Sequence, residues 1–320
     1  MSGENVIAQV VGKFVSPVEK LISLFGNACG KLYEPIHIKR MAKANSEAVK
    51  LLQDTFSKDS SLQQSFQNEY IKIDNKDLND ITIRAINRLS YQEICKQNNL
   101  ENVLSKTYTL LENVEKVEDV PIDPNWVWRY IDDVETIGNE TMQALWAKLL
   151  AGEIKTPNTF SLRTLNVLKN MTQAEAVLFE KIASYVFTCR SNIGIDYFLF
   201  AHEFINNAGI KYDELQILSE AGLISLVSGV SIGFPIKARE SENINLYNSN
   251  LCYKITNITD REINYVHPAY CLSESGKQLL KIININKIEK NYLEEQKKFI
   301  YYSLLGDKVK TYTVKVEENN

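Results

Sequence analysis

Apolar residues recur every three or four positions along much of this chain, the spacing of amphipathic helices. The first stripe consists of Ile7, Val11, Phe14, Val18, Leu21 and Phe25. Polar residues, among them Lys20, occupy the other side. A proline disfavours helical geometry in the residue before it and suits the first helical position, so the pattern predicts one helix that ends near Ser16 and another from Pro17 to about Tyr33. Gly26 and Gly30 are one turn apart, which predicts that another backbone approaches closely there.

The same spacing predicts more helices through the middle of the chain. Residues 36–57 form one, and residues 77–117 form two that are separated near Gln97-Asn98-Asn99. An acidic stretch with two prolines precedes Trp126 and is typical of a linker. Helices are then expected at about 125–136, 140–151 and 161–170.

The C-terminal part combines helices with alternating, strand-like segments. Thr172 is expected to cap a helix over Gln173–Phe187, and Asp213–Gly222 is expected to be a helix that leads into a strand. Residues 228–272 predict hairpins, Ser273 caps a further helix, and 308–316 alternates like an edge strand. The order helix, strand, hairpin, strand, helix is typical of a winged-helix module. We therefore expect a mainly α protein with an α+β winged-helix-like C-terminal domain, divided at 1–58, 59–171 and 172–320.

Charge and cysteine usage exclude several classes of protein. The net charge is −4 and only residues 1–58 are net basic, which argues against a general nucleic-acid binder. The five cysteines are widely spaced, without a C-x-x-C pair, so we expect neither a disulfide framework nor a zinc site. The three histidines are isolated. No metal, cofactor or catalytic residue is predicted, and the reducing cytoplasm is the expected location.

The basic residues Lys39, Arg40 and Lys43 crowd the start of the expected helix at 36–57. Cations stabilise the other end of a helix, so local stability does not explain this cluster and an anionic surface is a candidate partner. Together with the apolar stripe and the two glycines, it forms a candidate contact region. Two interpretations stay open: a buried helical hairpin or a seam for self-association or a protein partner, and an amphipathic segment lying on the inner membrane surface.

Two alternatives come from the C-terminal part. A winged helix suggests a DNA-binding regulator, but the helix in the recognition position carries Asp213, Glu214 and Glu220 and no cation, so phosphate would repel it. We expect protein contact there instead. The pattern Gly229-x-Ser231-x-Gly233 matches the nucleophile elbow of a serine hydrolase, which requires a helix after the turn. Pro235 and the strand-like continuation argue against that helix.

The stretch from Glu140 to Met171 predicts a helix, a turn and a second helix, and it contains no recognisable chemistry. Its motif residues are Trp146, Leu150, Gly152, Glu153, Pro157, Ser161 and Arg163. We interpret them as structural: small residues allow close helix packing, Gly152 or its neighbour permits the turn, and Arg163 pairs with Glu153 or caps carbonyls. The segments 146–153 and 160–165 resemble a bacterial family, domain of unknown function 2806, which has no assigned activity and so implies no catalytic residues.

The helix–turn–helix and the later Gly222-Leu223-Ile224 are also similar, in order and spacing, to the Abi-alpha abortive-infection family. That resemblance implies phage defence by a growth-arresting effector. The functional prediction is a non-enzymatic effector or adaptor that acts through oligomerisation or membrane contact. A winged-helix regulator and a serine hydrolase using Ser231 are the alternatives.

Overall fold

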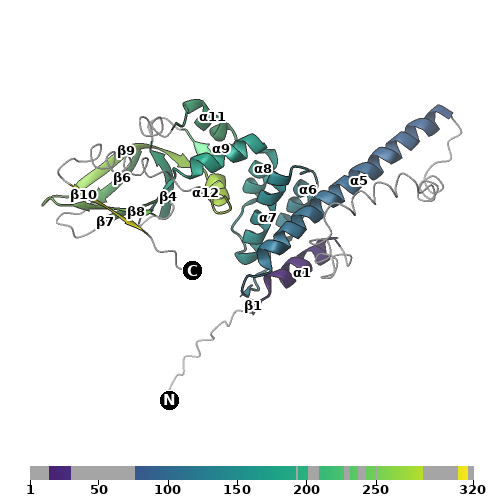
Figure 1. The fold of residues 1–320 in the computed structure, drawn as a ribbon, viewed down its shortest axis with the longest axis horizontal. Helices are drawn as coiled ribbons and strands as arrows, with labels where there is room; N and C mark the ends of the chain where they lie inside the picture. The colour runs from purple at the N-terminus through teal and green to yellow at the C-terminus, as the bar shows by residue number, and fades with distance from the viewer. Residues whose placement is uncertain are drawn as a thin grey trace, which may run out of the picture. The chain divides into compact units, whose positions relative to one another are not determined.

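The computed structural model describes residues 14–29, 76–191, 194–200, 209–226, 231–236, 243–248, 251–283 and 309–315. The chain divides into two compact units, Met1–Leu165 and Asn166–Asn320 (Figure 1). The described residues include eight helices and ten mostly short strands, and more of them lie in helices than in strands. The expected mainly helical class is therefore confirmed.

The first unit is a bundle built around a long helix. Its helices are α1 (Pro17–Cys29), α5 (Lys76–Leu111), α6 (Pro124–Val134), α7 (Glu140–Lys155) and the start of α8 (Leu162–Asn170). Helix α5 packs against α7, and α1 contacts α5, α6 and α7. Figure 1 shows the N-terminal half of α5 extending beyond α6 and α7. The core of this unit therefore surrounds only the C-terminal part of α5.

The N-terminal end of the first unit differs from the expectation. Phe14 and Val15 form a short strand, β1 (Phe14–Val15), which pairs with β2 (Val117–Glu118) in antiparallel register. The predicted helical geometry at Phe14 is therefore wrong, because cross-strand pairing replaces it. The predicted helix start at Pro17 is confirmed. The expected helix at 36–57 lies outside the described residues. So do six of the expected contact residues: Ile7, Val11, Gly30, Lys39, Arg40 and Lys43.

Helix α5 runs without a break where the sequence predicted one. Gln97 donates a hydrogen bond to Glu101 one turn later, at 2.8 Å. The Asn99 side chain donates to the carbonyl of Glu135 at 2.8 Å, which fixes α5 against the end of α6. Asparagine and glutamine disfavour an isolated helix only weakly, so these contacts are sufficient to keep the chain helical.

The three helices expected between 124 and 170 are present. The side chains of Asp123 and Asn139 accept hydrogen bonds from backbone N–H groups in the first turns of α6 and α7. Helix α7 continues to Lys155, so Gly152 lies inside the helix and does not form the turn. Asn158 adopts the left-handed conformation that the turn requires, with φ of 66°. Asparagine tolerates this region better than most residues.

The second unit contains an antiparallel sheet of eight strands. Seven strands follow the order β10-β8-β7-β3-β4-β9-β5, and β6 also pairs with β9. Their bounds are β3 (Phe187–Ser191), β4 (Gly194–Phe200), β5 (Ile224–Ser225), β6 (Ser231–Ile236), β7 (Asn243–Asn248), β8 (Leu251–Asn257), β9 (Ile263–Leu272) and β10 (Val309–Lys315). Strand β10 lies at one edge of this order, as its alternating sequence predicted.

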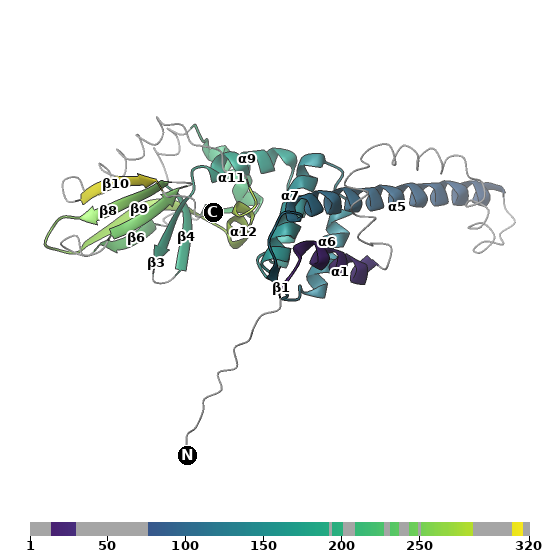
Figure 2. The same cartoon turned by 60° about the horizontal axis from the view of Figure 1, so that its bottom comes forward.

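Three helices gather at one end of this sheet (Figure 2). They are α9 (Gln173–Ala183), α11 (Tyr212–Glu220) and α12 (Glu274–Leu280). Thr172 forms a capping box with Glu175 at the start of α9, and Ser273 caps α12, as expected. Gly222 ends the segment after α11 with φ of 78°. The expected helix-to-strand order after Asp213 is present, within a sheet larger than that of a simple winged helix.

Candidate functional site

The centre of the first unit is an aromatic cluster. Tyr130 stacks on Trp126, with ring centroids 5.2 Å apart, and meets Trp146 edge-on at 5.4 Å. Phe25 of α1 also contacts Tyr130 edge-on, at 6.5 Å. The Tyr130 hydroxyl donates to the carbonyl of Trp146, and the Trp126 indole donates to the carbonyl of Phe160. Trp146 is fully buried and its indole N–H has no acceptor among the described residues.

Glu153 organises the turn between α7 and α8. Its buried carboxylate accepts hydrogen bonds from the backbone N–H groups of Asn158, Thr159 and Phe160. Burial raises the pKa of Glu153, and these three donors oppose that effect. A carboxylate that accepts several N–H groups is a structural anchor, since its lone pairs are already occupied.

The remaining motif residues are placed around this turn. Leu150 is fully buried, and Pro157 lies in the turn. The Ser161 hydroxyl accepts from the N–H of Thr164 at the start of α8. Arg163 is exposed, and no hydrogen bond or ion pair joins it to Glu153 or to another described residue. The expected Arg163–Glu153 pair is therefore wrong, because backbone donors occupy the carboxylate.

The expected contact residues of α1 separate into two groups. Leu21 and Phe25 are fully buried in the core of the first unit, whereas Phe14 is 57% exposed and Val18 is partly exposed. This burial removes Leu21 and Phe25 from the surface on which the sequence placed them. Among the described residues, nothing lies within 4 Å of a Cβ added at Gly26, so the described part of the chain supplies no close backbone there, and the close approach at Gly26 and Gly30 stays a prediction.

Lys20 was expected on the polar side of α1 but is only 9% exposed. Its ammonium donates to the carbonyl of Glu118 at 3.1 Å and to that of Ile154 at 3.3 Å. The Ile154 carbonyl is in the last turn of α7, where carbonyls lack helical partners and a cation is favourable. Burial lowers the pKa of Lys20, while the charges of Asp119 and Glu153 oppose the shift.

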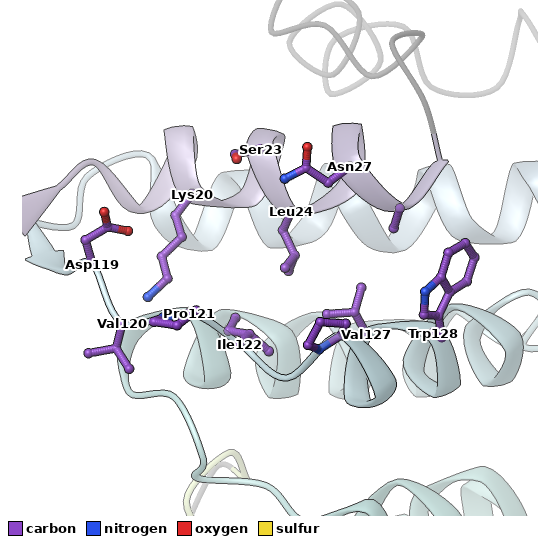
Figure 3. A pocket seen from close by; sticks show the side chains of 12 residues that line it. Lys20, Ser23, Leu24, Asn27, Asp119, Val120, Pro121, Ile122, Val127 and Trp128 are labelled. Carbon is purple, nitrogen blue, oxygen red and sulfur yellow. The ribbon is translucent and has the colours of Figure 1, made fainter.

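A groove of about 310 Å³ lies beside Lys20, between α1 and the segment that leads into α6 (Figure 3). Figure 3 shows Lys20 and Asp119 toward one end of the groove and Trp128 at the other. Its lining residues are Lys20, Ser23, Leu24, Asn27, Ala28, Asp119, Val120, Pro121, Ile122, Pro124, Val127 and Trp128. No motif in the sequence pointed to it. The prolines and the exposed Trp128 were the only local signals.

Helix α5 presents a second unusual surface. Its first buried residue is Leu100, and none of the described side chains between Ile81 and Asn99 is buried. Four large apolar residues of this part are exposed: Ile81 (56% exposed), Ile83 (40%), Leu89 (53%) and Tyr91 (60%). At about 100° per residue, Ile81 and Leu89 lie on one side of the helix, which we call the α5 face, and Ile83 and Tyr91 lie on the opposite side. Nineteen residues of helix span about 28 Å. Large apolar side chains exposed over such a length are typical of an interaction site.

The described residues of the second unit do not form a nucleophile elbow at Ser231. Residues Ser231–Ile236 form strand β6, which pairs with β9, so the helix that a nucleophile elbow requires does not follow. Helix α11 has no cation between Tyr212 and Glu220, and its Tyr212 and Ile217 are 57% and 43% exposed. Among the described residues, no group of histidine, cysteine and acidic side chains is arranged to hold a metal ion.

None of the helices in the described part of the chain combines the length and hydrophobicity needed to cross a bilayer.

The architecture defines a class of mainly helical protein in which a helical bundle is joined to a unit with an antiparallel sheet. The chain belongs to the family described as protein of unknown function, DUF2806, whose model matches residues 83–297. The match includes the Trp146–Arg163 motif. No curated protein matches this chain, and no solved structure does. The similarity to the Abi-alpha family stays a prediction.

Proposed function

We propose that this protein is a non-enzymatic effector or adaptor that self-associates through the α5 face. The observation that carries the proposal is the exposure of Ile81 and Leu89 on one side of a helical segment in which no described side chain is buried. Burying a large apolar side chain contributes about 1.5–3 kcal/mol, so these two supply about 3–6 kcal/mol toward association in each copy.

A second copy of the chain fits this surface better than a membrane does. Charged residues of both signs lie between the apolar ones, and Glu93 pairs with Lys96 of the same helix at 2.6 Å, so a protein surface of mixed character suits this segment. Closed, symmetric pairing is also the commonest form of protein assembly. Membrane contact through α1 is disfavoured because Leu21 and Phe25 are part of the core.

The second unit fits a protein-binding role in the same proposal. We assign α9 and α11 with strands β4, β9 and β5 to a winged-helix-like core. The strand order β4-β9-β5 and the position of β5 directly after α11 support this assignment. Without a cation, α11 is unsuited to phosphate, and its exposed Tyr212 and Ile217 are better suited to a protein surface.

Light scattering coupled to size-exclusion chromatography tests self-association. The full chain should elute as a species larger than its 36.6 kDa monomer. The double variant Ile81→Glu, Leu89→Glu should elute as a monomer with an unchanged circular dichroism spectrum. Val177→Glu replaces an equally exposed apolar residue in the second unit and should stay oligomeric. A wild-type monomer throughout the micromolar range would contradict the proposal.

The cellular role is tested with the same variants. We propose a phage-defence effector, so expression in a bacterial host should slow growth or reduce plaque formation. The Ile81→Glu, Leu89→Glu variant should lose this effect, and Val177→Glu should keep it. Equal effects of all three proteins, at matched expression, would separate the cellular role from self-association.

A further inference from the structure

The groove beside Lys20 is built on fixed walls. Ile122 and Val127 are 7% and 3% exposed, so the apolar floor belongs to the core of the first unit. Asp123 caps α6 and holds the entering chain in place. The bonds from Lys20 to Glu118 and Ile154 connect the groove wall to two other segments. Walls held in this way lose little entropy when a ligand binds.

The size and lining of the groove resemble those of a binding site. A volume of about 310 Å³ lies at the lower end of the range for ligand pockets. Its walls are mainly apolar, with a few polar groups, which is the usual composition of such pockets. Trp128 lies at one end of the groove and is 52% exposed. Burying so large an aromatic side chain is favourable, so a ligand that covers Trp128 would gain binding free energy.

Lys20 has donor capacity left over. An ammonium group carries three N–H donors, and the two carbonyls of Glu118 and Ile154 use two of them. No third acceptor is found among the described residues. Lys20 thus already donates hydrogen bonds to two backbone carbonyls. A backbone carbonyl of a bound peptide would accept the third N–H in the same way.

Asp119 is the acidic residue that lines the groove, where Lys20 is the cation. Glu19, Glu118 and Asp123 are exposed on the same two segments without lining it, and they add negative charge near its opening. Negative potential at a rim favours a positively charged partner and speeds its association. The face of an exposed tryptophan also attracts arginine and lysine side chains.

We propose that this groove binds a short extended segment of a partner protein in which an apolar residue is flanked by arginine or lysine. The apolar side chain fills the space between Leu24, Ile122 and Val127. A carbonyl of the segment accepts the remaining N–H of Lys20. A basic side chain lies against Asp119, and another covers Trp128. This interaction is separate from self-association through the α5 face, and neither requires the other.

A peptide array tests the proposal with the full-length protein. Random octapeptides are probed, and peptides that combine apolar residues with arginine or lysine should be enriched. Trp128→Ala should weaken the selected peptides roughly tenfold in fluorescence polarisation, because cation–π contacts and cover of the ring are lost. Asp119→Lys should weaken them further and shift the preference toward acidic peptides. Both residues are exposed, so both variants should fold.

Asp132→Lys is the matched control, because it makes the same charge change on α6 at a residue that does not line the groove. The peptide affinity of Asp132→Lys should stay within about twofold of the wild-type affinity, because salt screens the charge of a distant surface residue. Enrichment that is equal for the wild type and Trp128→Ala would overturn the proposal. So would preference for acidic peptides, or full displacement of bound peptide by a small quaternary amine. The oligomer size of Asp119→Lys should equal that of the wild type, which keeps the two proposals distinguishable.

Discussion

Replacing Gly276 with alanine should destabilise the second unit markedly. Gly276 lies in α12, and a Cβ built there falls against the backbone carbonyl of Leu223 at a separation well inside the 3.0 Å that real Cβ atoms respect. The obstacle is backbone, so no side chain can turn aside. Helix α12 would have to move away from the turn that follows α11.

That movement breaks specific contacts. The N–H of Ser273 donates to the Leu223 carbonyl at 2.9 Å, and the Ser273 hydroxyl donates to the carbonyl of Gly222. Overpacking costs about 1–3 kcal/mol, and each lost hydrogen bond costs about 0.5–1.5 kcal/mol. Alanine returns about 0.5–1 kcal/mol through its helix propensity. The net loss for Gly276→Ala is therefore about 1–5 kcal/mol.

Gly26→Ala is the matched control, because Gly26 also lies inside a helix but has nothing within 4 Å of an added Cβ. It should stabilise the first unit by about 0.5–1 kcal/mol. Urea unfolding can follow both units. All three tryptophans, Trp126, Trp128 and Trp146, are in the first unit, so their fluorescence reports that unit. Circular dichroism reports both.

For Gly276→Ala, we expect a lower denaturation midpoint by circular dichroism and little change in the fluorescence transition. For Gly26→Ala, the fluorescence midpoint should rise. A midpoint for Gly276→Ala equal to that of the wild type by circular dichroism would show that α12 can shift without cost, and the reasoning from close packing would fail.

Four other substitutions probe individual contacts, and denaturant unfolding measures each. Glu153→Gln should cost about 2–3 kcal/mol, because an amide NH₂ replaces one of the oxygens that accept backbone N–H groups; Arg163→Ala should stay within about 0.5 kcal/mol. Trp146→Phe should cost less than about 1.5 kcal/mol, since it removes a buried donor without an acceptor; a loss as large as that of a truncation to alanine would refute this. Burial alone would raise the pKa of Glu214, but the hydrogen bond and charge of Lys181 hold it below its ordinary value. A carboxyl pKa that is lowered in the folded state stabilises the protein at pH values above the unfolded pKa, and this stabilisation is lost as the pH falls. Acid should therefore lower the free energy of unfolding more for the wild type than for Lys181→Met, by about 1 kcal/mol or less. Parallel pH profiles of the two proteins would contradict this expectation.

Local sequence signals predicted the elements that depend on local contacts. The start of α1 at Pro17 and the caps of α9 and α12 follow from single residues and their immediate neighbours. The order of elements after Asp213, from helix to strands and then to a second helix, was also visible, because Gly222 and Ser273 mark its boundaries. These signals act within one turn of a helix or one strand, so no tertiary information was needed.

Errors arose where distant segments decide the structure. Asn99 reads as a helix breaker, but its contact with Glu135 comes from another helix. Glu153 was paired with Arg163 because the charges match, yet three backbone N–H groups were nearer. Lys20 has an ordinary position on the polar side of its helix. Nothing in its local sequence shows that two carbonyls, 98 and 134 residues away, surround it.

The long separation between Lys20 and Ile154 has a consequence for the order of synthesis. Helix α1 emerges first from the ribosome but cannot reach its final contacts until α7 has been made, 134 residues later. At about 5–20 residues per second, this delay lasts roughly 7–27 s. During that time Leu21 and Phe25 have no core to enter. The nascent chain therefore exposes an apolar segment during that time, which favours aggregation of unfinished chains.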